Sequence, residues 1–71
     1  MTAKEGVKYL LEKCDMQEPI FILRGRDRLA PGVVLHWAHL AEKNGVSEEK
    51  VCGAIKVSSD MGNWPQNRLP D

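Results

Sequence analysis

The sequence has no apolar run close to the roughly 20 residues that a membrane-spanning helix needs. Its N-terminus also lacks the apolar core of a secretory signal peptide. The only two cysteines, Cys14 and Cys52, lie far apart and form no CxxC pair, which is typical of a reducing compartment rather than of a secreted disulfide scaffold. We therefore expect a cytoplasmic protein without a membrane partner.

Motifs of catalysis and cofactor binding are missing as well. No serine or cysteine stands in a nucleophile motif, and there is no GxGxxG or P-loop. His36, His39 and Glu42 follow one another at three-residue spacing, whereas helical metal pairs favour i, i+4 within a richer ligand set. A catalytic role of His36 or His39 with Asp27 has no support beyond residue type. We predict a protein that is not an enzyme and holds neither cofactor nor metal.

The chain is too short to bury a large core. Its 71 residues form one domain, residues 1–71, and a domain of this size buries only about 60% of the surface that it exposes when unfolded. The usual staples of small domains, disulfides and bound metals, are poorly supported by this sequence. We therefore expect a homo-oligomer, with a dimer favoured, because association buries further surface.

Spacing and end signals predict a mostly α-helical fold of three helices, at residues 3–14, 31–44 and 47–62. Pro31 suits the first turn of the second helix, Gly45 suits its left-handed C-terminal cap, and Ser47 suits the N-cap of the third. The inner faces predicted from the apolar spacing are Val7, Leu10, Leu11 and Cys14, then Val33, Val34, Trp37, Ala38 and Ala41, then Val51, Ala54, Ile55, Ser58 and Met61.

Two segments lie outside the predicted helices. Residues 19–24 contain PIFIL, whose β-branched and aromatic residues predict a short extended or β segment. Because the chain has no second strand signal, this segment either pairs with its copy in another subunit or packs on the helices as a linker. Residues 65–71 predict a flexible tail, unless Trp64 pins its start to the core.

Positive charge gathers at one joint of a chain whose formal net charge is zero. Residues 24–28, RGRDR, carry three arginines against one aspartate and leave 7 basic and 9 acidic residues elsewhere. A local cluster of this kind argues against a general polyanion binder and favours one compact anion site. Arg24, Arg26 and Arg28 precede a helix whose free N–H groups would also attract an anion.

A local resemblance covers residues 40–55. Ala41, Gly45, Val46 and Val51 resemble the helix-turn-helix of DNA-binding regulators, in which small and apolar residues lock two helices around a glycine turn. The acidic residues Glu48 and Glu49 depart from that pattern, because they would meet phosphate repulsion in the groove. Two helices packed around an ordinary glycine turn explain the same residues without DNA.

A wider resemblance covers residues 19–64. The chain is similar to short uncharacterised proteins encoded by bacteriophages and prophages, whose pattern is P-x-F-x-L-R, D-x-L-A-P and V-x-x-W-A, then a glycine turn and a helix ending near a tryptophan. The matching positions are Pro19, Phe21, Leu23, Arg24, Asp27, Leu29, Ala30, Pro31, Val34, Trp37, Ala38, Gly45, Val51, Ala54, Met61 and Trp64. The resemblance implies a phage setting and an α-helical domain. Small phage proteins of this size are often binding proteins that disarm host defence.

These observations lead to a hypothesis of ligand capture. The candidate ligand-binding residues are Arg24, Gly25, Arg26, Asp27, Arg28 and Trp37. Arginine forks would hold phosphate, Gly25 would allow a close backbone approach, and Trp37 would stack a base if exposed. The ligand would be an anionic, nucleotide-like molecule such as a cyclic oligonucleotide framed by two copies of the loop. The alternatives are docking on a host protein, DNA binding, and a solvated arginine loop with Trp37 in the core.

Overall fold

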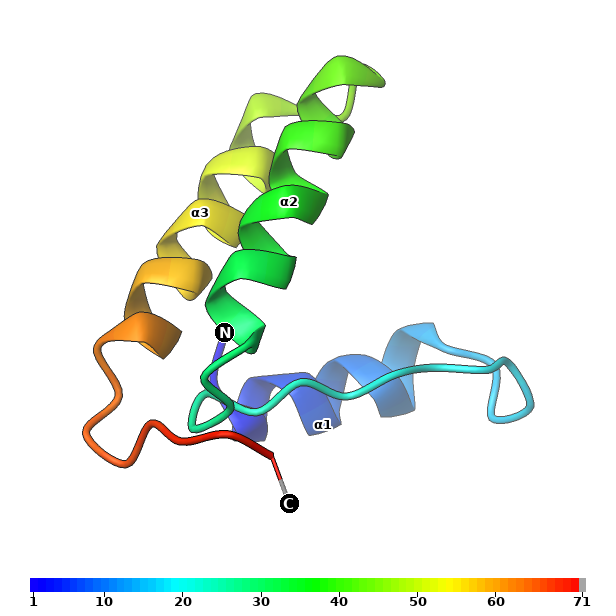
Figure 1. Ribbon diagram of the computed structural model, residues 1–71. Helices are drawn as coiled ribbons and strands as arrows, with labels where there is room; N and C mark the ends of the chain where they lie inside the picture. Colours follow the sequence, from blue (N-terminus) through cyan, green and yellow to red (C-terminus); the bar gives the residue numbers. More distant parts are fainter. Residues whose placement is uncertain (71) are drawn as a thin grey trace.

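The computed structural model describes residues 1–70 and contains three helices, α1 (Ala3–Lys13), α2 (Ala30–Lys43) and α3 (Glu48–Gly62). The predicted mostly α-helical fold is confirmed, and every helix end lies within one residue of its predicted position. Residues 19–24 belong to no helix, and within the described part of the chain they pair with no strand. α1 lies across one end of the upright α2 and α3 (Figure 1).

α2 and α3 form an antiparallel hairpin and lie side by side along their lengths (Figure 1). Gly45 has a φ of 78°, the left-handed conformation that lets the chain leave α2. The Ser47 hydroxyl then accepts a hydrogen bond from the Lys50 N–H and caps α3. The recognition helix of a helix-turn-helix crosses its neighbour at about 90–120°. The hairpin therefore corresponds to two helices packed around an ordinary glycine turn, the second interpretation given above for residues 40–55.

Small side chains make up the contact between α2 and α3. Ala38, Ala41 and Val51 are buried together, with Ala54 packed against them. Near the base of the hairpin, the Ser58 hydroxyl donates a 2.8 Å hydrogen bond to the Pro31 carbonyl. Alanine faces let the helix backbones approach closely, but they bury little apolar surface. The described residues include no large side chain that is fully buried.

The predicted inner faces of α2 and α3 are therefore partly wrong. Val33 and Trp37 remain half exposed on α2, and Ile55 is 42% exposed on α3. The inner stripe of α2 runs through Ala30, which is fully buried, to Ala38 and Ala41. Spacing of three or four positions does not tell which of two neighbouring helical faces packs inward. The alanine face packs against α3 because small side chains let the two helices approach closely.

Residues 1–23 form an N-terminal arm made of α1, a turn and the extended segment. In the described residues, no Cα of α1 lies within 8 Å of a Cα of α2 or α3. α1 contains no buried residue, which corrects its predicted inner face: Val7 and Leu11 are more than half exposed, and Leu10 and Cys14 are only partly covered. Partial burial, together with the nearby Glu18, raises the pKa of Cys14.

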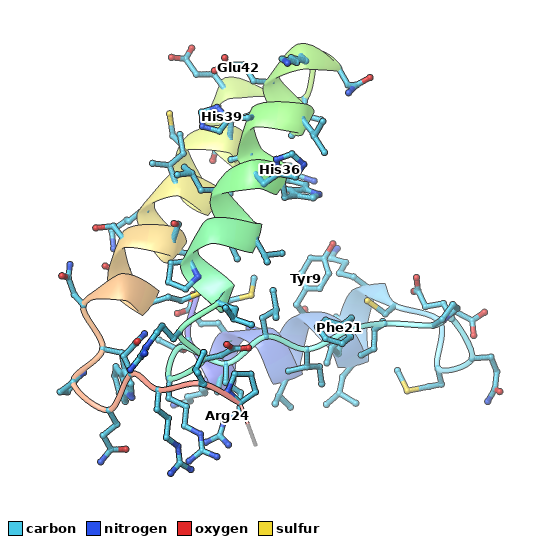
Figure 2. The ribbon with its side chains drawn as sticks, viewed as in Figure 1. Tyr9, Phe21, Arg24, His36, His39 and Glu42 are labelled. Atoms are coloured by element: carbon cyan, nitrogen blue, oxygen red, sulfur yellow. The ribbon has the colours of Figure 1, made fainter. Side chains whose placement is uncertain are left out.

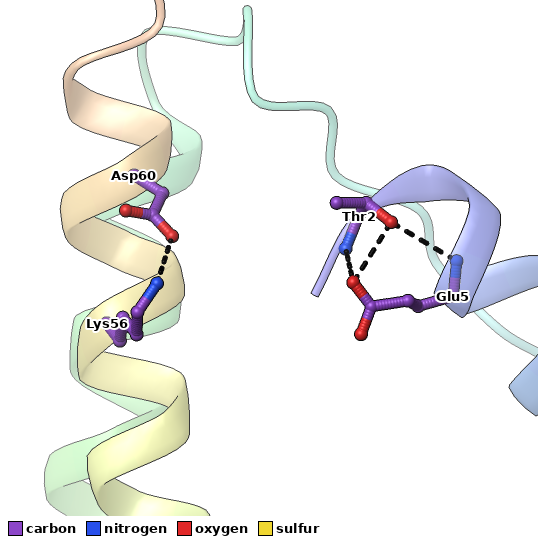
Figure 3. A network of polar contacts seen from close by, with 4 residues as sticks. All are labelled: Thr2, Glu5, Lys56 and Asp60. Carbon is purple, nitrogen blue, oxygen red and sulfur yellow. Dashed lines mark hydrogen bonds and ion pairs between the residues drawn. The ribbon is translucent and has the colours of Figure 1, made fainter.

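A capping box begins α1 (Figure 3). The Glu5 carboxylate accepts hydrogen bonds from the Thr2 N–H and hydroxyl, both at 3.1 Å, and the Thr2 hydroxyl accepts one from the Glu5 N–H. The backbone hydrogen bond from Thr2 holds the pKa of Glu5 below its ordinary value. Figure 3 also shows the ion pair between Lys56 and Asp60, which is exposed and so contributes at most about 0.5 kcal/mol.

The lowered pKa of Glu5 predicts an acid-sensitive N-terminus of α1. Because the folded-state pKa is depressed, the contribution of the capping box is present above the unfolded-state pKa and is lost as the pH falls through the folded-state value. We expect the Thr2 and Glu5 backbone amide signals in NMR spectra to shift with a midpoint below about 4.3, the ordinary glutamate value. The Glu5→Gln variant should lack this transition, and a midpoint at or above the ordinary value would contradict the capping role.

The described residues contain no helix that is both long and apolar enough to cross a bilayer.

Candidate anion-binding site

The arginine loop, residues 24–29, is folded by hydrogen bonds around Asp27. The Asp27 N–H donates to the Arg24 carbonyl at 3.0 Å, and the Asp27 carboxylate accepts from the Leu29 N–H at 2.8 Å. The Ala30 N–H then donates to the Asp27 carbonyl at 3.0 Å as α2 begins. Asp27 thus organises the loop that leads into α2, although the N-cap position of the helix is Leu29 and carries no side-chain hydrogen bond.

The C-terminal segment crosses this loop and is held to it. The Arg68 N–H donates to the Arg26 carbonyl and the Arg28 N–H donates to the Arg68 carbonyl, each at 2.7 Å. These bonds form a parallel bridge between Asp27 and Arg68. The sequence did not indicate this attachment of the predicted tail, residues 65–71, of which Asp71 lies outside the described residues. The bridge brings a third arginine beside Arg24 and Arg26.

A shallow cavity of about 280 Å³ opens where the arm, the loop and the C-terminal segment meet. Its wall combines three arginines and one carboxylate with apolar side chains: Phe21, Ile22, Arg24, Arg26, Asp27, Arg68, Leu69 and Pro70. Arg24 projects from the lower end of the molecule, below the extended segment that carries Phe21 (Figure 2). Phe21 is 86% exposed, so an aromatic face is available at the edge of the positive cluster.

The charges of this cavity are not neutralised within the described residues. The only ion pair there is Lys56–Asp60, on α3. Asp27 directs a carboxylate oxygen to a backbone N–H and forms no ion pair with an arginine. The residues that line the cavity lead into α2, but this helix end offers few free donors. Asp27 already accepts from the Leu29 and Ala30 N–H groups, and Pro31, in the first turn, has no N–H. The positive charge of the site therefore comes from the arginines and not from the free N–H groups predicted for this helix. Arg24, Arg26 and Arg68, none of which forms an ion pair within residues 1–70, therefore line a space that an anion could occupy.

Only half of the predicted site residues line this cavity. Arg24, Arg26 and Asp27 do, whereas Gly25, Arg28 and Trp37 do not. Trp37 is half exposed on α2, neither core nor part of the cavity.

Gly25 packs toward the end of α3 rather than toward the cavity. A Cβ placed on it would lie 3.9 Å from Met61 Cγ and 4.0 Å from Trp64 Cγ, which are ordinary contact distances. Its φ is not positive, so a close approach to a ligand is not the reason for this glycine. Trp64, near the foot of α3, thus packs beside the arginine loop, although it remains half exposed.

His36, His39 and Glu42 lie along α2, at the other end of the molecule from Arg24 (Figure 2). Among residues 1–70, no group of three or more histidine, cysteine, aspartate or glutamate side chains is placed to hold a metal ion.

Five cavity residues were absent from the predicted site: Phe21, Ile22, Arg68, Leu69 and Pro70. Phe21 had been assigned to the apolar extended segment, and Arg68 lies 40 residues after Arg28 in a segment with no helical or strand pattern. The high exposure of Phe21 follows from the path of residues 19–24 outside the hairpin.

Comparison with protein-family models, curated proteins and solved structures finds no match to this chain. The similarity to phage-encoded proteins therefore stays a prediction, and the function has to be argued from the site itself.

Proposed function

We propose that this protein is a non-enzymatic binding protein that captures a phosphate-bearing, nucleotide-like anion at the arginine cavity. The observation that supports the proposal best is the convergence of Arg24, Arg26 and Arg68 on one cavity without a carboxylate partner among residues 1–70. Guanidinium groups bind phosphate through paired, charge-assisted hydrogen bonds, which are about twice as strong as neutral ones. A phage setting and the capture of a host defence signal are parts of the proposal that rest on the sequence resemblance.

The apolar part of the wall favours a nucleotide over inorganic phosphate. Phe21 offers an aromatic face on which a base can stack, a contact typically worth about 1–3 kcal/mol. Ile22 and Leu69 extend the apolar surface on the same wall. A ligand with both a phosphate and a base would therefore use the two kinds of surface that meet in this cavity.

The size of the cavity favours a ligand shared between two copies of the protein. Its volume of about 280 Å³ lies at the lower limit of ligand pockets, which are typically about 300–1,000 Å³. One cavity therefore covers only part of a larger ligand. A cyclic oligonucleotide with two or more phosphates would be enclosed if two arginine loops faced each other.

Docking on a host protein is the second candidate function, because the chain exposes many large apolar side chains. It predicts no response to nucleotides. DNA binding has less support, because the antiparallel hairpin does not present α3 as a recognition helix.

The Arg68→Ala variant tests the proposed site. We expect its affinity for the best-bound nucleotide of a linear and cyclic panel, measured by titration calorimetry, to fall about 10- to 100-fold, as for the loss of one charged hydrogen-bonding group. The matched control is Arg28→Ala, which removes the same charge from a residue outside the cavity wall. We expect the control to retain affinity within about threefold, since it loses only a screened, longer-range attraction.

Two results would count against the proposal. Equal losses in Arg28→Ala and Arg68→Ala would mean that the ligand senses general positive charge rather than this cavity. No binding of any nucleotide to the wild-type protein at low ionic strength would remove the proposed function and leave protein docking.

A further inference from the structure

The chain exposes far more surface than a folded monomer of its mass. Its accessible surface is 6062 Å² for 8.0 kDa, whereas a monomeric protein of that mass exposes about 4,450 Å². The radius of gyration, 12.8 Å, also exceeds the roughly 11 Å of a compact domain of this length. The excess of roughly 1,600 Å² is comparable to the surface that each partner buries in an obligate interface, about 1,000–2,500 Å².

Much of the exposed apolar surface lies on the N-terminal arm, residues 1–23. Eight large apolar side chains there keep half or more of their surface exposed: Met1, Val7, Tyr9, Leu11, Met16, Ile20, Phe21 and Ile22. At about 100 Å² each they would supply roughly 800 Å², the share of one partner in a standard interface. Within residues 1–70, α1 does not pack against α2 or α3, and the eight side chains remain exposed.

The arm contains a groove as well as protruding side chains. The space between α1 and the returning segment has a volume of about 300 Å³ and a mostly apolar wall that includes Leu10, Leu11, Met16 and Ile20. Protruding apolar side chains beside an apolar groove on one segment are the features that a two-fold, self-complementary contact requires.

Charge on the arm is compatible with such a contact. Residues 1–23 carry three lysines and four acidic residues, so two arms brought together do not repel each other strongly. The arginine loop, with its excess of positive charge, begins only after the arm ends. A strongly charged partner would gain little electrostatic attraction from this surface, because its positive and negative charges nearly balance.

We infer that the arm is the surface through which copies of this chain associate. The buried core of one chain, three alanines and Val51, is too small to stabilise it alone. The partner that completes the fold must be present whenever the protein is made, and a second copy of the same chain meets that requirement. The test of this inference is separate from that of the proposed ligand, because it targets α1 and the groove. Of the eight exposed side chains of the arm, only Phe21 and Ile22 also line the arginine cavity.

Sedimentation velocity of the full chain tests the inference, at about 1 and about 100 μM, since association follows mass action. We expect the wild-type protein to sediment as an oligomer at the higher concentration. Leu11→Glu, which places a charge in the groove, should sediment as a monomer there. The matched control Ile55→Glu adds the same charge at an exposed apolar position of α3 and should remain oligomeric.

Thiol labelling of the wild-type protein measures the covering of the groove directly, and it can be done even if Leu11→Glu does not fold. Cys14 lines the groove, whereas Cys52 is exposed on α3 and reports on the hairpin. On dilution from about 100 to about 1 μM, the labelling rate of Cys14 relative to Cys52 should rise about tenfold as the groove is uncovered.

Three results would overturn the inference: a monomeric wild-type protein at 100 μM, an oligomer that dissociates with Ile55→Glu, or a Cys14 to Cys52 labelling ratio that does not change with concentration. Neither Leu11 nor Ile55 lines the arginine cavity, so failure here is distinguishable from failure of ligand binding.

Discussion

The Ala38→Asp variant is expected to lose the α2–α3 hairpin. Ala38 is completely buried among the few side chains that join the two helices. A carboxylate there would be desolvated without a partner, at a cost of about 3–5 kcal/mol. Chains of this length are typically stable by only about 4–10 kcal/mol. Far-UV circular dichroism and thermal unfolding should therefore show a largely unfolded or strongly destabilised protein.

The neighbouring substitution His39→Asp is the matched control. It introduces the same side chain one position along α2, on the exposed face of the helix. We expect the free energy of unfolding to change by less than about 1 kcal/mol, which covers helix propensity alone. If the two variants unfolded at the same temperature, Ala38 would not be buried between α2 and α3, and the described hairpin core would be wrong.

The double variant Arg24→Ala/Arg26→Ala is expected to abolish capture of the nucleotide ligand. Hydrogen bonds to charged groups contribute about 1.5–3 kcal/mol each, so loss of both arginines should weaken binding by about 100-fold or more. Affinity measured by calorimetry at physiological ionic strength would report this loss. A drop of less than about fivefold would place the ligand elsewhere.

Folding of this double variant should be unaffected. Within the described residues, neither guanidinium group makes a hydrogen bond or an ion pair. The hydrogen bonds of Arg24 and Arg26 are made by their backbone carbonyls, which the substitutions leave in place. The unfolding midpoint of the ligand-free variant should therefore match that of the wild-type protein within about two degrees. A large shift would mean that the arginines stabilise the fold and would weaken their assignment to a ligand.

The helices could be predicted because their signals are local. Pro31, Gly45 and Ser47 act on the backbone within one turn of where they stand, and the structure places each at the predicted helix end. The Thr2–Glu5 capping box is equally local, since T-x-x-E before an apolar run is its signature, but it was not among the helix ends that we predicted from their caps.

The buried face was harder to predict because packing decides it. Val33 and Trp37 have the size expected of core residues, yet the hairpin closes on Ala38 and Ala41. A small residue lets two backbones approach, and that advantage appears only once the partner helix is in place. Large apolar residues left outside such a contact stay exposed and can be buried when copies of the chain associate.

Three of the eight cavity residues, Arg24, Arg26 and Asp27, were predictable from the clustering of charge in residues 24–28. The contribution of Arg68 was not, because it depends on two backbone hydrogen bonds that join residues distant in sequence. Arg28 shows the opposite case. It belongs to the charge cluster, but its backbone position at the bridge leaves its side chain outside the cavity wall.

Thermal unfolding of the purified protein against linear and cyclic phosphorylated nucleotides, with duplex DNA in the same plate, tests the central proposal most directly. A ligand present at a hundred times its dissociation constant adds about 2.7 kcal/mol, which should raise the midpoint of so small a domain by roughly ten degrees or more. We predict such a shift with a nucleotide bearing two or more phosphates, and its absence in Arg24→Ala/Arg26→Ala. A panel without any shift for the wild-type protein would contradict capture of an anionic ligand at the arginine cavity.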